Sequence, residues 1–258
     1  MLQGTHTRET RDAAREIKFL VTPDLAAQVL GWARNHLTPD PHGHGPAGDE
    51  YRIQSLYLDT DLLSVFHRQG SYARSKYRVR RYGSSEMVFL ERKMRTSRLL
   101  SKRRTLVPAA DLERLQHWSS DATWDGDWFG RRLDVRRVAP VCQVSYRRHA
   151  LVGLGQYGPM RLTFDEGIIA QKNRTFGFVP EAGAAVASDH VIIEMKYCVD
   201  TPAVFRRVVE AFRLIPAPIS KYRLSMDVLR AAADPLAAAT GNVNVLDGHG
   251  GLTGLINA

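Results

Sequence analysis

Acidic and basic side chains alternate with apolar ones in several short segments of this 258-residue chain. Glu-x-Lys occurs at 16–18, 91–93 and 194–196, and Arg-x-Arg occurs at 78–80, two residues after a lysine. In a β-strand, residues i and i+2 point to the same face. Each segment would therefore carry its charges on one side and apolar residues on the other. Lys and Arg held in place in this way bind phosphate oxygens, so the spacing indicates a site for a phosphorylated anion.

One strand with an ionic face is ordinary, because most antiparallel sheets expose one side to water. Here five or six strands repeat the arrangement with acids and bases mixed. A closed barrel, charged inside and covered by helices outside, accounts for all of them together. Two like charges about 8 Å apart, at an effective dielectric constant near 20, repel by roughly 2 kcal/mol. Many enclosed cations therefore favour a linear tri- or polyphosphate as the occupant, whereas a nucleic-acid duplex requires an open basic surface.

Positive charge is concentrated in one part of the chain. The formal net charge is +9, yet the segment 68–104 alone has thirteen Lys or Arg and two acids, a local net charge of +11. The rest of the chain therefore sums to about −2. This concentration predicts an anionic partner, for which the candidates are nucleic acid, a membrane surface and a small polyphosphate.

The elements that must position these side chains follow from the same patterns. Thr22-Pro23 and Thr201-Pro202 each predict a helix start with Thr as the N-cap, and further helices are expected at 111–118 and 220–232. The mostly antiparallel order predicts an α+β fold with one domain at 15–232, a disordered leader at 1–14 and a disordered tail at 233–258. Strands are expected at 16–21, 51–59, 75–82, 87–94, 99–107, 141–152, 160–170 and 191–197.

Several other features limit the class of protein. No run of 18 apolar residues occurs, so no membrane-spanning helix is expected. Cys142 and Cys198 are too few for a disulfide framework and are typical of a reducing compartment, which predicts a cytoplasmic protein. The segment 153–158 matches G-x-G-x-x-G, but Pro159 and a strand pattern follow it instead of a helix, so a hairpin turn is expected there.

Nine short motifs occur in order between about residues 15 and 230. They are Glu16-Ile-Lys18-Phe-Leu-Val, Ile53-Gln-Ser-Leu-Tyr-Leu-Asp59, Arg78-Val-Arg80-Arg-Tyr-Gly83, Leu90-Glu91-Arg-Lys93, Lys102-Arg-Arg104, Tyr146-Arg-Arg148-His-Ala150, Arg161-Leu-Thr-Phe-Asp165, Ile193-Glu194-Met-Lys196 and Ser220-Lys221-Tyr222. Together they resemble the polyphosphate polymerase domain of the vacuolar transporter chaperone (VTC) family, within the CYTH-like triphosphate tunnel metalloenzymes. The resemblance is to prokaryotic stand-alone members, and it implies an eight-stranded antiparallel β-barrel with flanking helices.

The resemblance also implies an activity, the transfer of the γ-phosphoryl group of ATP to a polyphosphate chain with Mn²⁺ or Mg²⁺. Lys18, Arg78 and Arg80 would hold the reacting triphosphate. Together with the metal-binding Glu194 they are the implied catalytic residues. Glu16 and Asp165 are further candidates for metal ligands, with ion pairing as the alternative role. Phosphate contacts are implied for Lys93, Lys102, Arg148, Arg161, Lys196 and Lys221.

Two positions depart from the family pattern, and the activity has alternatives. Pro218 stands where the family often has a second lysine before the one that matches Lys221. Arg147 and Arg148 are adjacent, so only one can face inward, and the Tyr-x-Arg-x-Ala spacing favours Arg148. A triphosphate or polyphosphate hydrolase of the same fold is the first alternative. A sensor that binds polyphosphate or inositol polyphosphate without turnover is the second, and a nucleic-acid binder using 68–104 is the third.

Overall fold

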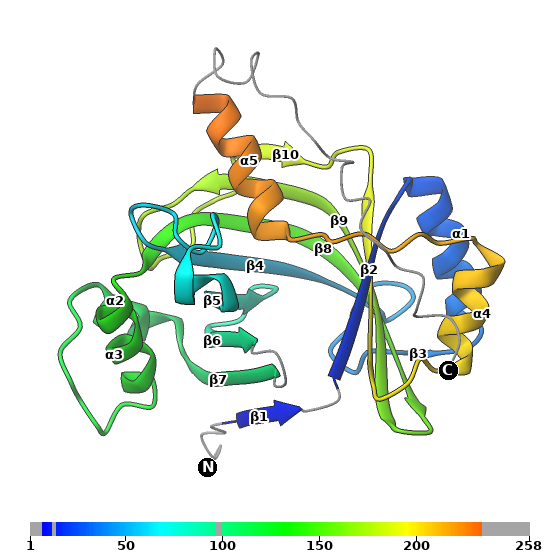
Figure 1. Cartoon of the computed structure of the whole chain (residues 1–258), viewed down its shortest axis with the longest axis horizontal. Coiled ribbons are helices and arrows are strands. Elements are labelled where there is room, and N and C mark those ends of the chain that lie inside the picture. The colour runs from blue at the N-terminus through cyan, green and yellow to red at the C-terminus, as the bar shows by residue number, and fades with distance from the viewer. Residues whose placement is uncertain (1–6, 12–13, 96–99, 234–258) are drawn as a thin grey trace.

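The computed structural model describes residues 7–11, 14–95 and 100–233 (Figure 1). Its centre is one antiparallel sheet of eleven strands, with the hydrogen-bonded order β1-β7-β6-β5-β4-β8-β9-β11-β2. The short strands β3 and β10 lie off this path and pair with β8 and β9. The strands are Thr7–Arg11 (β1), Ala14–Val21 (β2), Thr38–Pro39 (β3), Glu50–Asp59 (β4), Ser75–Tyr82 (β5), Met87–Arg95 (β6), Leu100–Pro108 (β7), Ala139–Gly155 (β8), Gly158–Lys172 (β9), Ala184–Val186 (β10) and Val191–Cys198 (β11).

Helices cover the sheet in three places (Figure 1). Two helices, α1 and α4, pack side by side over β2, β9 and β11 through a cluster that contains Phe19 and Phe205. The short α2 and α3 lie over β5 to β7, where Phe129 is fully buried. The last helix, α5, runs along β8, β9 and β10. The helices are Pro23–Arg34 (α1), Glu113–Gln116 (α2), Asp127–Arg136 (α3), Ala203–Ala211 (α4) and Lys221–Ala233 (α5), with 3₁₀ turns at Gly70–Arg74 and Ala109–Leu112.

The eight predicted strands are confirmed as β2, β4 to β9 and β11, apart from Leu99, which lies outside the described residues. Alternation is the reason that they were predictable. In β11, Ile193 and Met195 are fully buried in the cluster below α1 and α4, whereas Glu194 and Lys196 point to the opposite face. Hydrophobic burial on one side thus fixes the direction of the charges on the other.

The two predicted Thr-Pro helix starts can be compared with the observed N-caps. The Thr22 side chain accepts a hydrogen bond from the Leu25 amide (3.4 Å) at the start of α1, so that prediction is confirmed. At α4 the N-cap is Pro202 and not Thr201, whose hydroxyl instead contacts the Tyr197 hydroxyl (2.9 Å). Helix α3 was not among the predicted helices.

Part of the expected leader lies in a strand. Residues 7–11 form β1, which pairs along the outer edge of β7 in the register Glu9 to Lys102. The segment has no apolar alternation, so its sequence gave no strand signal, and the backbone of the β7 edge supplies the pairing partner. The rest of the expected leader up to residue 13, and the expected tail from residue 234, lie outside the described residues. Ala233 is the last residue of α5.

The sheet curves until strands from its two ends approach each other. Lys93 on β6 donates to Glu16 on β2 (3.1 Å), although these strands lie near opposite ends of the hydrogen-bonded order. Arg80 on β5 likewise reaches the Tyr146 hydroxyl on β8 (3.1 Å), across β4. The pairing among the described residues is an open path from β1 to β2. The fold is therefore the expected one, but the curved sheet is not closed by hydrogen bonds as a full barrel would be.

Two further expectations concern local chain features. The segment 153–158 forms the hairpin between β8 and β9, with Gly155 paired to Gly158, so the hairpin prediction is confirmed. Gly158 has a φ of 115°, a backbone conformation that favours glycine.

In the part of the chain that the structure describes, no helix is long and apolar enough to cross a membrane.

Candidate functional site

The strand register places the charged candidates on one face of the curved sheet. Lys18 lies opposite Glu194 and Glu16 opposite Lys196 across β2 and β11. Arg78 lies opposite Glu91 across β5 and β6. The sheet curves toward this side, which we call the ionic face because the charged residues lie on it. Its charged residues are Glu16, Lys18, Lys76, Arg78, Arg80, Glu91, Lys93, Lys102, Arg104, Arg148, Arg161, Asp165, Glu194 and Lys196.

Glu16 on β2 joins the two ends of the sheet. Its carboxylate contacts the Lys18 ammonium (2.8 Å) and the Lys93 ammonium (3.1 Å). Burial and the nearby Glu194 carboxylate would raise the pKa of Glu16, but Lys18, Lys196 and Lys93 together lower it to about 2. Glu16 is therefore ionised at neutral pH and holds two cations in place.

Glu194 on β11 is more buried than Glu16 on β2. Its carboxylate is buried and contacts Lys196 (2.5 Å) and Lys18 (3.6 Å). Burial alone would raise the pKa of Glu194, yet the cations, with Lys196 and Lys18 first, hold it well below its ordinary value. Burial outweighs the carboxylates around Lys196 and lowers the pKa of that ammonium.

Glu91 on β6 lies between Arg78 (2.5 Å) and Lys102 (3.1 Å) and is almost fully buried. Burial would raise the pKa of Glu91, but Arg78 and Lys102 hold that pKa well below its ordinary value. Arg80, next to Arg78 on the same face, is only 5% exposed. It donates hydrogen bonds to the hydroxyls of Ser55 and Tyr146, both at 3.1 Å, and no carboxylate among the described residues pairs with it.

Asp165 on β9 receives two cations from different elements. Arg148 on β8 donates to both carboxylate oxygens (2.6 and 2.7 Å), and Lys221 at the start of α5 pairs with the same group. Burial would raise the pKa of Asp165, but these two cations lower it to about 2. Arg147, by contrast, is exposed and pairs with Glu166 (2.8 Å). The structure thus confirms that Arg148, and not Arg147, faces inward.

The structure adds contacts that the sequence did not predict. Arg161 pairs with Asp40 (2.7 Å) and reaches the Tyr51 hydroxyl. The Tyr146 ring lies 5.5 Å from the Arg148 guanidinium and 5.3 Å from the Lys221 ammonium. The Tyr-x-Arg spacing that identified Arg148 was also a signal for Tyr146. Nothing in the sequence connected Asp40 with Arg161, because a loop residue distant in the chain has no periodic pattern.

The arrangement leaves the ionic face with excess positive charge. Each of the four carboxylates, Glu16, Glu91, Asp165 and Glu194, contacts two cations. Arg80 contributes further charge without an acidic partner among the described residues. Buried cations in excess of acids repel one another, so a bound polyanion would relieve this repulsion and gain several charge-assisted hydrogen bonds.

The three candidate metal ligands do not form a protein cage. No group of three His, Cys, Asp or Glu side chains suited to a metal comes together within the described residues. Glu194 is nevertheless opposite Thr163, whose buried hydroxyl has no hydrogen-bond partner in the part of the chain described. Mg²⁺ is commonly held by one or two carboxylates together with substrate phosphates and water. Glu194, Glu16 and Asp165 each contact two cations, but Glu194 alone of the three lies directly opposite this unpartnered hydroxyl, so the donors at Glu194 and Thr163 fit that kind of shared site.

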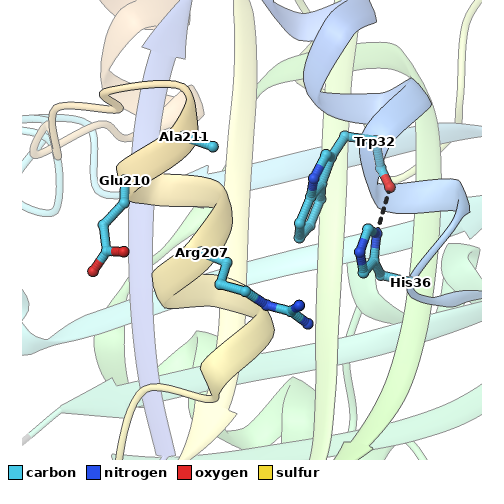
Figure 2. A pocket seen from close by; sticks show the side chains of 5 residues that line it. All are labelled: Trp32, His36, Arg207, Glu210 and Ala211. Carbon is cyan, nitrogen blue, oxygen red and sulfur yellow. Dashed lines mark hydrogen bonds between the residues drawn. The ribbon is translucent and has the colours of Figure 1, made fainter.

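A separate groove lies on the outside of the molecule, between α1 and α4 (Figure 2). It has a volume of about 530 Å³ and is lined by Trp32, His36, Arg207, Glu210 and Ala211. The His36 ring stacks on Trp32 at 3.8 Å between centroids and hydrogen-bonds the Trp32 carbonyl oxygen (2.8 Å). None of the charged residues of the ionic face lines this groove, so it is not the predicted site.

The low pKa values of Glu16 and Asp165 predict a loss of stability in acid. Both groups have pKa values of about 2 in the native state, against ordinary values of 4.5 and 3.8. Stability from these pairs is complete above those ordinary values and is lost as the pH falls toward 2, because the unfolded chain binds protons first. We expect the free energy of unfolding, measured in urea from pH 7 to 3, to fall below pH 4.5. The decrease should be smaller in Glu16→Gln. Equal decreases in both proteins would contradict a lowered pKa of Glu16 in the native state.

The family model of the VTC domain matches residues 13–230. Among solved structures, a Bacillus halodurans protein provisionally assigned as an adenylate cyclase has a TM-score of 0.53 and 14% identity, covering 83% of this chain and 95% of that chain. An adenylyl cyclase candidate from Hippeastrum, described as having a dominant triphosphatase activity, has a TM-score of 0.45 and 15% identity, covering 84% of this chain and 96% of that chain. No curated protein matches the chain in sequence. The Bacillus halodurans structure supports the fold alone.

Proposed function

This chain belongs to the VTC domain family, and we propose that it is a metal-dependent phosphotransferase that moves the γ-phosphoryl group of ATP onto a polyphosphate chain. Family membership and fold support a protein that acts on triphosphate or polyphosphate. The observation that carries the proposal is the excess of buried cations on the ionic face, above all Arg80, which is buried without a carboxylate partner among the described residues. The family resemblance is the basis for proposing polymerase activity in particular.

The residues of the ionic face have distinct proposed roles. Lys18 on β2 and Arg78 and Arg80 on β5 hold the reacting triphosphate, since all three have partly buried or buried charges on the ionic face. Phosphoryl transfer depends mainly on positioning and on neutralising charge, so no protein nucleophile is required. The remaining cations hold the growing chain, and these are Lys93, Lys102, Arg148, Arg161, Lys196 and Lys221.

We propose that Glu194 holds Mn²⁺ or Mg²⁺ with the Thr163 hydroxyl nearby. When bound, the metal supplies a positive charge that bridges phosphate oxygens. Glu16 and Asp165 were also expected as metal ligands, and their observed contacts favour the other role, in which they fix Lys18, Lys93, Arg148 and Lys221 in position. Proline at position 218 has no charge to offer a phosphate, and Lys221 on α5 pairs with Asp165 of the ionic face.

We propose a cytoplasmic location on the basis of cysteine chemistry. Cys142 and Cys198 are both free. Unpaired thiols are typical of a reducing compartment.

The activity is tested by incubating the full chain with ATP and Mn²⁺, then separating products on a polyacrylamide gel stained for polyphosphate. We expect long chains together with ADP, and no product when the metal is removed with EDTA. Free phosphate in place of chains would favour the hydrolase. Tight binding of triphosphate without turnover would favour a sensor. Salt-sensitive binding of long DNA that triphosphate does not displace would favour a nucleic-acid binder.

A further inference from the structure

Lys76 occupies a position on the ionic face that the predicted site does not include. It is on β5, two residues before Arg78, and is partly buried. Its ammonium donates to the Ser220 hydroxyl (3.1 Å), and Ser220 immediately precedes α5. Among the described residues, the Ser220 hydroxyl is the only hydrogen-bond partner of Lys76, and no carboxylate pairs with its charge.

Three neighbouring elements, and β5 itself, present cations to Lys76. The strongest neighbours are Lys18 on β2, Arg223 on α5, Lys93 on β6 and Arg78 on its own strand. Burial first, and then these charges, lower the pKa of Lys76 to about 7. At neutral pH the ammonium is therefore protonated in only part of the molecules.

The acids on the neighbouring elements are already engaged by other groups. Glu16 on β2 pairs with Lys18 and Lys93, and Glu91 on β6 pairs with Arg78 and Lys102. Asp59, at the end of β4, accepts hydrogen bonds from the amides of residues 60, 65 and 66 and from the Tyr222 hydroxyl. Three of the cations around Lys76 therefore have a carboxylate partner of their own, whereas the Lys76 ammonium pairs with none in the described part of the protein.

We propose that Lys76 and Ser220 form a phosphate-binding subsite at the α5 end of the ionic face, and that Lys76 takes up a proton when a phosphate group of the bound chain fills it. The inference rests on the proposed function, in which the ionic face binds triphosphate or polyphosphate. A phosphate dianion reverses the sign of the potential at Lys76, so its pKa rises in the complex. The proton comes from the solvent, and no bond in the anion is broken.

The sign of the pH dependence follows from this linkage. Below about pH 7 the lysine is already charged, and binding requires no proton. Above that pH, each further unit lowers the affinity by up to about tenfold until the pKa of the complex is reached. In Lys76→Arg the guanidinium stays charged at all these pH values, so this additional decrease should disappear.

The test measures the binding of inorganic tripolyphosphate, without metal, to the full chain by calorimetry between pH 7 and 9. Two buffers of different ionisation enthalpy at each pH report how many protons are taken up. We expect the affinity of the unsubstituted protein to fall about tenfold more than that of Lys76→Arg between pH 7.5 and 8.5, with more protons taken up on binding by the unsubstituted protein than by Lys76→Arg. Titration of tripolyphosphate itself is common to both proteins and cancels in the comparison.

Two further variants separate the subsite from the rest of the face. Lys76→Met should bind tripolyphosphate several-fold more weakly at pH 7 and should lack the additional pH dependence. Ser220→Ala should also bind more weakly but should keep the additional pH dependence, because Lys76 is still present. Thermal unfolding of each variant verifies that the fold is retained. Equal pH dependence in the unsubstituted protein and Lys76→Arg would overturn the subsite while leaving the proposed function in place. Failure of the unsubstituted protein to bind tripolyphosphate at any pH would overturn both.

Discussion

Replacing Glu194 with Gln is expected to lower phosphoryl transfer at least a hundredfold while triphosphate still binds. The substitution keeps the size of the side chain but removes the buried negative charge that we assign to the metal. Loss of one preorganised electrostatic contact to a transition state commonly costs a factor of 10²–10³ in turnover. Binding of triphosphate without metal should be retained or become tighter, because the ionic face then has one carboxylate fewer.

The Glu194 experiment needs a readout that a structural role would not change. In the unsubstituted protein, Mn²⁺ should strengthen triphosphate binding, and in Glu194→Gln this effect should disappear. Glu166→Gln is the matched control, since Glu166 is on β9 but pairs with the exposed Arg147 outside the ionic face (2.8 Å). Glu166→Gln should keep normal turnover and the normal response to Mn²⁺. Normal turnover and a normal Mn²⁺ response in Glu194→Gln would exclude Glu194 as the metal ligand.

The sequence predicted the strands and the direction of their charges because both follow from alternation. Glu194 and Lys196 face one way since Ile193 and Met195 between and beside them are fully buried on the other side. Arg148 was selected over Arg147 by the Tyr-x-Arg-x-Ala spacing of its motif. Periodic patterns of this kind are local, so one strand at a time is enough to read them.

The pairing between strands could not be predicted in the same way. Glu16 and Lys93 are 77 residues apart, and their contact depends on how far the sheet curves. Curvature is set by packing of the helices and by irregularities in the sheet, such as the register shift in β8 between residues 145 and 147. The partners of Arg161 and Lys76 come from a loop and from the start of a helix, where no periodic signal exists.

Replacing Arg80 with Met should weaken triphosphate binding and lower kcat/KM by about two orders of magnitude. Arg78 shares Glu91 with Lys102, so its removal also disturbs an ion-pair network. Arg80 is a cleaner probe, because its partners are the hydroxyls of Ser55 and Tyr146 and its loss leaves no carboxylate unpaired. A hydrogen bond to a charged group contributes about 1.5–3 kcal/mol, which corresponds to a factor of roughly ten to more than a hundred.

The matched control for Arg80 is the next residue in the chain. Arg81 is on the opposite face of β5, where its guanidinium donates to the Gln54 side chain (2.9 Å) and lies 4.5 Å from the centre of the Phe178 ring. Arg81→Met removes the same charge from the same strand and should leave kcat/KM and triphosphate affinity unchanged. If Arg80→Met weakens triphosphate binding and Arg81→Met does not, the effect comes from the position of Arg80 on the ionic face and not from the net charge of the protein. If both reduce triphosphate binding equally, the anion is attracted by overall charge, and the ionic face is not its binding site.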